Sequence, residues 1–104
     1  MVDWTRSLRR HGFTRIYWLN GHGGNIATIN AAFAEIYAEG SFAKAEVAAA
    51  SGADGLRQKT ANWWELPGIF KLCTDIYPEG HGAHATASEV AVTQYAYPEH
   101  IKRA

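Results

Sequence analysis

The sequence predicts an α/β protein with parallel strands flanked by helices, and three observations support this fold class. Residues 16–19, Ile-Tyr-Trp-Leu, are apolar without alternation, which is typical of a strand covered on both faces in a parallel sheet. A polar, glycine-rich loop, residues 20–25, follows directly. From Ile26 to Tyr37, apolar residues then recur at three- and four-residue steps, as in an amphipathic helix. A strand, a turn and a helix in this order begin a βαβ unit, whose crossover should be right-handed.

The composition indicates one globular domain over residues 1–104. Hydrophobic residues make up 47% of the chain and charged residues 19%, which argues against disorder. The formal net charge is zero, so we expect no nucleic acid partner. No apolar run is long enough to cross a bilayer or to form a signal peptide, so we expect no membrane partner and a cytoplasmic location. The single cysteine, Cys73, excludes an internal disulfide and is better explained as a small core residue than as a nucleophile.

Two elements are expected before the glycine-rich loop. Residues 2–11 have the pattern of an amphipathic helix, with Gly12 as its left-handed C-cap. The strand then covers residues 14–19, and its apolar character requires neighbours that cover it.

After the loop, a helix is expected to start behind Asn25 as its N-cap and to end at Gly40. Residues 44–50 are placed as the second parallel strand, and residues 51–60 as a surface loop. The apolar face of the helix comprises Ile26, Ile29, Phe33, Ile36 and Tyr37.

Two further helices are expected towards the C-terminus. The first covers residues 66–77 and has Pro67 near its start, and the second covers residues 86–97 and stops at Pro98. Between them lies a second loop rich in glycine and histidine, residues 78–84.

The glycine-rich loop, Asn-Gly-His-Gly-Gly-Asn, is the first candidate site. Its glycines allow a close approach of the backbone to a ligand, and the following helix directs its positive dipole end there. Ligands of open α/β sheets bind beyond the carboxyl ends of the strands, where His22 can ligate a metal or transfer a proton. The alternative is a plain turn with a solvated histidine.

For each of the other candidate site residues, a purely structural role is an alternative to a role in a functional site. Trp63 and Trp64 can wall a pocket for a flat ligand, or can lie one in the core and one half-exposed. His84 and Glu89 flank a helix start and can face one site, although Glu89 also fits a capping box with Thr86. His81 is best explained as a solvated loop residue.

Four segments together resemble the creatininase family of creatinine amidohydrolases and related metal-dependent amide hydrolases. They are Ser-Leu-Arg-Arg-His-Gly-Phe at 7–13, the glycine-rich loop, His-Ala-Thr-Ala-Ser-Glu at 84–89 and Tyr-Pro-Glu at 97–99. The resemblance covers almost the whole chain but only the C-terminal part of the family's domain. Family members carry upstream a Glu-x-His segment and an aspartate that supply much of a two-metal site, so the chain is expected to be a truncated, incomplete half-site.

The resemblance implies part of a creatininase-like three-layer sandwich that hydrolyses a cyclic or linear amide with Zn²⁺ or Mn²⁺. It implies that His22 and Glu89 are metal ligands and that His84 transfers a proton or contacts substrate. The expected substrate-binding residues are three from the glycine-rich loop and the tryptophan pair: Asn20, Gly23, Asn25, Trp63 and Trp64.

Two hypotheses come from other functional classes. One is a non-catalytic module for oligomerisation or small-ligand binding that derives from the same fold. The other makes the glycine-rich loop a phosphate cradle, which the absence of G-x-G-x-x-G and of a Walker lysine disfavours. Because an apolar strand requires cover, we also expect a homo-oligomer or a separate chain that supplies the missing N-terminal part.

Overall fold

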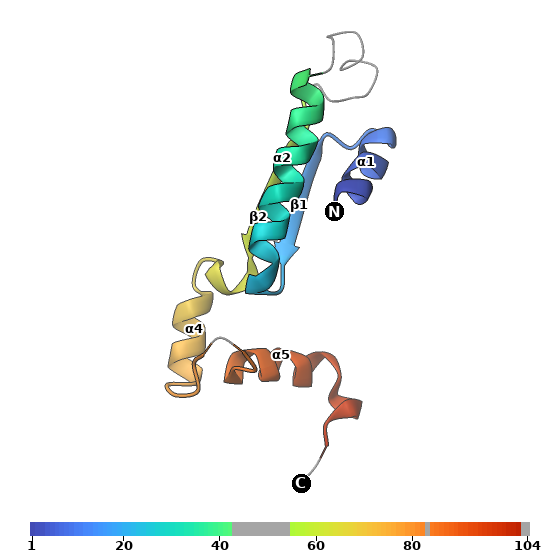
Figure 1. Cartoon of the computed structure of the whole chain (residues 1–104). Helices are drawn as coiled ribbons and strands as arrows, with labels where there is room; N and C mark the ends of the chain where they lie inside the picture. Colours follow the sequence, from blue (N-terminus) through green and yellow to red (C-terminus); the bar gives the residue numbers. More distant parts are fainter. Residues whose placement is uncertain (43–54, 83, 103–104) are drawn as a thin grey trace. The chain divides into compact units, whose positions relative to one another are not determined.

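The computed structural model describes residues 1–42, 55–82 and 84–102, which belong to two compact units, Met1–Trp63 and Trp64–Ala104. The units are described in turn. Along the chain the helices, strands and 3₁₀ turns (η) are α1 (Val2–Arg10), β1 (Arg15–Asn20), η1 (Gly23–Asn25), α2 (Ile26–Phe42), β2 (Arg57–Asn62), η2 (Trp63–Glu65), α4 (Ile69–Ile76), α5 (Ala87–Ala96) and η3 (Pro98–His100) (Figure 1).

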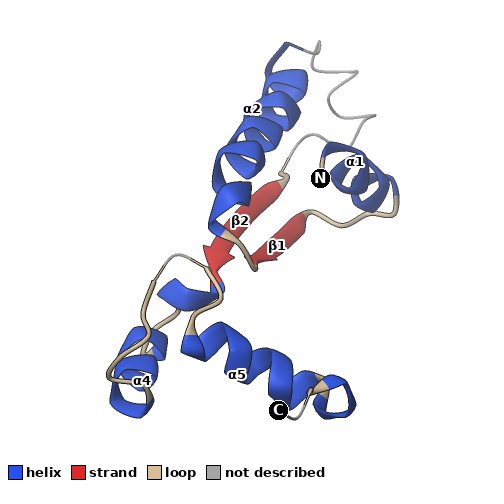
Figure 2. Ribbon diagram, turned by 60° about the horizontal axis from the view of Figure 1, so that its bottom comes forward, coloured by secondary structure: helices blue, strands red, loops and turns tan. Residues whose placement is uncertain are grey.

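The first unit is built on a parallel pair of strands. β1 and β2 lie side by side and run in the same direction (Figure 2). They pair in register from Arg15 opposite Arg57 to Asn20 opposite Asn62, and α2 lies between them in the sequence. This arrangement confirms the predicted α/β class with parallel strands and flanking helices.

One face of the sheet is covered by helices. The α1 residue Thr5 donates from Oγ1 to Gln58 Oε1 at 3.1 Å, and Trp4 stacks on Trp18 with ring centroids 6.2 Å apart. Arg6 of α1 pairs with Glu35 and Glu39 of α2. The two helices therefore lie side by side over this face.

The ion-pair cluster between the two helices is exposed. Arg6 binds Asp3 at 3.4 Å as well as the two α2 glutamates. The hydrogen bond to Glu39 raises the pKa of Arg6, partial desolvation opposes this, and the charges of Glu39, Glu35 and Asp3 add to the increase. Because surface ion pairs contribute little to stability, the cluster mainly fixes how α1 lies on α2.

On the other face of the sheet, the first unit supplies no cover in its described residues. Burial alternates along β1, and Tyr17 and Leu19 are 56% and 62% exposed. The predicted cover of this second face stays a prediction. The apolar run does not distinguish the two faces, because its sequence lacks the alternation that the burial shows.

α2 supplies most of the core. Ile29, Ala32 and Ile36 are buried, and Leu56, directly before β2, joins them. Of the five apolar residues predicted to form the buried face of α2, Ile26 and Tyr37 are instead about two-fifths exposed, at 40% and 41%.

The expected end of α2 at Gly40 is also wrong. The helix continues to Phe42, because glycine lowers helix stability without preventing the helical conformation. Near this end the Tyr37 hydroxyl accepts the Gln58 N–H at 2.9 Å, which satisfies a backbone donor of β2.

The second strand differs from the predicted one. Residues 44–50 lie outside the described residues. β2 begins inside the segment predicted as a surface loop, residues 51–60, and extends two residues beyond it. β2 was not predicted, because its first four residues, Arg-Gln-Lys-Thr, are all polar and give the strand no apolar face. On the covered face, Gln58 and Thr60 form hydrogen bonds instead of apolar contacts. Gln58 Oε1 accepts the Trp18 Nε1–H at 3.1 Å, and the Thr60 hydroxyl donates to the Trp18 carbonyl at 3.3 Å.

The helix boundaries follow local signals. α1 ends at Arg10, one residue earlier than predicted, and Gly12 has the expected positive φ of +87°. In the second unit, α4 begins at Ile69 instead of residue 66, because Gly68 takes a φ of +83° before it. α5 lies inside its predicted range, and Cys73 of α4 is a half-buried free thiol.

Candidate functional site

Asn20 is the centre of the glycine-rich loop. It is the last residue of β1, is 4% exposed, and uses the full hydrogen-bonding capacity of its carboxamide. Nδ2 donates to the His22 carbonyl and to Asn62 Oδ1, both at 2.8 Å. Oδ1 accepts the His22 N–H and Asn25 Nδ2–H, both at 3.1 Å. The Asn20 side chain therefore ties the loop residues His22 and Asn25 to the end of β1.

Asn62 is a site residue that sequence reasoning missed. It ends β2 directly opposite Asn20, and its contact joins the carboxyl ends of the two strands. The available signal was the register of parallel strands, which places their carboxyl ends at one edge of the sheet. That signal could not be used, because the second strand had been predicted at residues 44–50 and not at β2.

The side chain of His22 lies outside this network and is exposed to solvent. Its Nδ1 accepts the Gly24 N–H at 3.1 Å and so caps η1. The Asn25 side chain donates to Asn20, and its backbone N–H donates to the His22 carbonyl at 3.1 Å. The expected role of Asn25 as the N-cap of α2 stays a prediction.

Gly24 lies close to the His22 ring. A Cβ at residue 24 would lie 3.0 Å from Cε1 and Nδ1 of His22, whereas one at Gly23 would meet no atom within 4 Å. A side chain at residue 24 would therefore displace the exposed imidazole slightly, and one at residue 23 would not.

In the second unit, Glu89 forms the predicted capping box. Its Oε2 accepts the Thr86 N–H at 2.9 Å and the Thr86 hydroxyl at 3.0 Å, while the Thr86 Oγ1 accepts the Glu89 N–H at 3.3 Å. His84 lies in the exposed bend before this cap, next to Ala85, which has a φ of 49°. His81 is exposed as predicted, with its ring centroid 6.4 Å from that of Phe70.

The tryptophan pair lies in η2, where the two units divide. Trp63 belongs to the first unit and Trp64 to the second, and both are half-buried. The alternative of one tryptophan in the core and one half-exposed is therefore wrong. Their role towards a substrate stays a prediction.

The family model described as creatinine amidohydrolase matches residues 1–104, the whole chain. The chain belongs to the creatininase family. No curated protein matches the chain. Membership of the creatininase family suggests an amidohydrolase, and the family is generally metal-dependent.

The donors described in this creatininase chain do not make up a complete metal site. Among the residues that the structure describes, no three His, Cys, Asp or Glu side chains gather in one group. Near His22, the carboxamide oxygens of Asn20 and Asn62 already accept hydrogen bonds. His22 therefore supplies one imidazole, whereas zinc requires three or four protein ligands.

The hydrogen bond at Nδ1 constrains how His22 can bind a metal. In a neutral imidazole, the nitrogen that accepts a hydrogen bond carries the lone pair, so the proton is assigned to Nε2. A metal at Nδ1 would replace the Gly24 N–H, and a metal at Nε2 would require the proton to move to Nδ1. Metal binding at His22 is therefore coupled to the cap of η1.

No helix in the described part of the chain is both long and apolar enough to cross a membrane.

Proposed function

We propose that this chain contributes the glycine-rich loop to a metal-dependent, creatininase-type site that hydrolyses a cyclic or linear amide C–N bond. The family match over the whole chain carries the proposal. It is supported by the place of the loop, at the carboxyl end of a parallel strand, where α/β sheets bind ligands.

His22 is proposed as one ligand of Zn²⁺ or Mn²⁺, and Glu89 as an acidic ligand. Imidazole and carboxylate are suitable donors for these metals. Since the described residues supply too few donors, the remaining ligands are proposed to come from an upstream part of the domain or from another chain. The chain is then a half-site, and its activity alone should be low.

The other loop residues are proposed to shape the substrate site. Asn20 is proposed to hold the loop in position without binding the substrate, because its four hydrogen bonds leave no capacity for a further one. Gly23 and Asn25, which are exposed, together with Trp63 and Trp64, are proposed to line the substrate position. His84 is proposed to transfer a proton to the leaving nitrogen, for which a histidine is well suited near neutral pH.

The loop geometry argues against a phosphate cradle. A cradle presents several backbone N–H groups to the ligand. Here the N–H groups of His22, Gly24 and Asn25 all donate within the loop, to Asn20 Oδ1, His22 Nδ1 and the His22 carbonyl. The arrangement favours a rigid support for the imidazole.

The test is amide hydrolysis by the purified chain with excess Zn²⁺ or Mn²⁺, using creatinine as a cyclic probe and a linear amide as the second. We expect slow hydrolysis that a chelator and His22→Ala abolish. The matched control His11→Ala alters another exposed, helix-capping histidine and should retain activity. Metal binding without hydrolysis of either amide would contradict the proposal and favour a non-catalytic ligand-binding module.

A further inference from the structure

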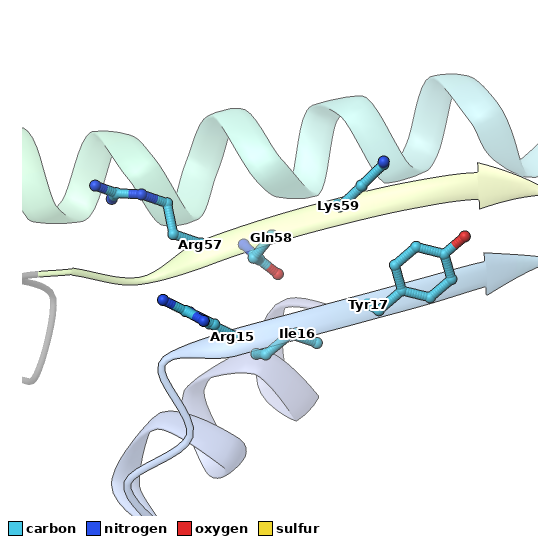
Figure 3. A pocket seen from close by; sticks show the side chains of 6 residues that line it. All are labelled: Arg15, Ile16, Tyr17, Arg57, Gln58 and Lys59. Carbon is cyan, nitrogen blue, oxygen red and sulfur yellow. The ribbon is translucent and has the colours of Figure 1, made fainter.

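The side chains of Asn20 and Asn62 connect the ends of the two strands. The strand register places residues 15–17 of β1 beside residues 57–59 of β2 (Figure 3), and the same register brings Asn20 opposite Asn62. Asn20 Nδ2 donates to Asn62 Oδ1 at 2.8 Å, across the two strands. The segments that follow, the glycine-rich loop after β1 and η2 after β2, are therefore tied together where they begin.

This contact is separate from the hollow drawn in Figure 3. The hollow has a volume of about 270 Å³ and is lined by residues 15–17 and 57–59, the first halves of the two strands. Asn20 and Asn62 are the last residues of the same strands. The two asparagines therefore belong to the edge of the sheet that carries the glycine-rich loop.

The backbone of His22 sets the orientation of the Asn20 carboxamide. Asn20 Oδ1 lies 3.1 Å from the His22 nitrogen, which can only donate, and Nδ2 lies 2.8 Å from the His22 carbonyl oxygen, which can only accept. The second hydrogen of Nδ2 needs its own acceptor, and Asn62 Oδ1 supplies it. Because Asn20 is 4% exposed, loss of that acceptor would leave a donor unpaired at a buried position.

The need for this acceptor makes the two segments depend on each other. A rotation of the Asn20 side chain towards another acceptor would also move Oδ1, which accepts the His22 N–H. The imidazole would then be displaced, since its Nδ1 accepts the Gly24 N–H within the same loop. In the other direction, displacement of Asn20 would remove the donor that holds Asn62, and the next residue is Trp63, the first of η2.

We propose that Asn62 is a positioning residue that holds the glycine-rich loop and the start of η2 in a fixed relation. The proposal rests on the proposed function, in which His22 binds the metal and Trp63 lines the substrate position. In this role Asn62 acts through Asn20 and does not bind the substrate. Its contribution is a constant separation between a metal ligand and a substrate-lining ring, and a misplacement of about 1 Å can lower catalysis about a hundredfold.

The first test observes His22 in the full chain without metal. Asn62→Ala removes the acceptor, so we expect the NMR signals of the His22 ring to shift and the His22 N–H to exchange with solvent at least about tenfold faster. Asn62→Asp keeps an oxygen acceptor at the same position and should retain the exchange rate of the wild type.

The matched control for this test is Thr60→Val. It removes another hydrogen bond from β2 to β1, the one from the Thr60 hydroxyl to the Trp18 carbonyl, and it keeps the size of the side chain. This variant should leave the exchange of the His22 N–H within about twofold of the wild type. Urea unfolding of each variant separates the local effect from a loss of overall stability.

The second test follows the opposite direction, from Asn20 to Trp63. The chain is labelled with fluorotryptophan, and the signals of its four tryptophans are assigned by replacing each in turn. Asn20→Ala should shift the Trp63 signal, and Asn30→Ala should not. Adding Asn62→Ala to Asn20→Ala should shift that signal no further, because the two side chains act through one contact.

Zinc titration connects this positioning role to the proposed site. Asn62→Ala should bind Zn²⁺ about tenfold more weakly than the wild type, as is typical when a residue that orients a metal ligand is lost, whereas Thr60→Val should bind within about twofold. If the wild-type chain binds no zinc, the proposed metal site is refuted, whereas the spectra without metal still decide the role of Asn62.

Three results would overturn the proposal. Unchanged His22 signals in Asn62→Ala would mean that the loop does not depend on β2. Equal effects of Asn62→Ala and Thr60→Val on His22 would mean that the contact only stabilises the sheet. Equal exchange rates in Asn62→Asp and Asn62→Ala would mean that the acceptor oxygen is not the feature that matters.

Discussion

Replacing Asn20 by alanine tests whether the network below the glycine-rich loop holds the site together. The substitution removes four hydrogen bonds from a side chain that is only 4% exposed. A neutral hydrogen bond contributes about 1 kcal/mol net, so four such bonds sum to about 4 kcal/mol. Because His22 and Asn25 are exposed and can bond to water instead, we expect a loss of about 2–3 kcal/mol.

The assay is equilibrium unfolding of the full chain in urea, followed by circular dichroism. A loss of this size corresponds to a fall in Tm of roughly 10–20 °C for a chain of about 100 residues. The control is Asn30→Ala, which alters an exposed asparagine of α2 and should change stability by less than about 0.5 kcal/mol. If both variants unfold within about 0.5 kcal/mol of each other, the network does not stabilise the loop.

Three further substitutions test other parts of the structure. Gly24→Ala should displace the loop imidazole and shift its NMR signals, whereas Gly23→Ala, which meets no neighbour, should not; identical spectra would contradict the contact. Glu89→Ala should cost about 1 kcal/mol of unfolding free energy and Glu89→Gln less than about half of that, while equal losses would argue against the capping box. Tyr37→Phe should cost about 1 kcal/mol through its lost hydrogen bond, and Tyr95→Phe, at a 90% exposed position, should cost almost nothing; similar melting temperatures for the two variants would refute this role.

The sequence predicted those elements whose signals are local. The apolar run of β1, the periodicity of α2 and the capping box at Thr86 and Glu89 all depend on neighbouring residues. The motifs at the two loops were likewise sufficient to indicate the creatininase family, which the match over residues 1–104 confirms.

The remaining features depend on contacts between distant segments. β2 is polar, and its strand is stabilised by pairing with β1 and by the contacts of Gln58 with Thr5 and Trp18. Because this strand was not predicted, the contact of Asn20 with Asn62 was not predicted either. The capping role of His22 was missed for another reason, since asparagine is the commoner N-cap.

The central claim is that His22 belongs to a metal site, and metal titration tests it most directly. The wild-type chain, His22→Ala and His11→Ala would each be titrated with Zn²⁺ and Mn²⁺ by calorimetry, followed by elemental analysis of the retained metal. We predict weak, saturable binding to the wild type and to His11→Ala, and at least about tenfold weaker binding to His22→Ala, because a direct ligand is removed. Equal affinity of all three chains, or no binding by any of them, would contradict the assignment.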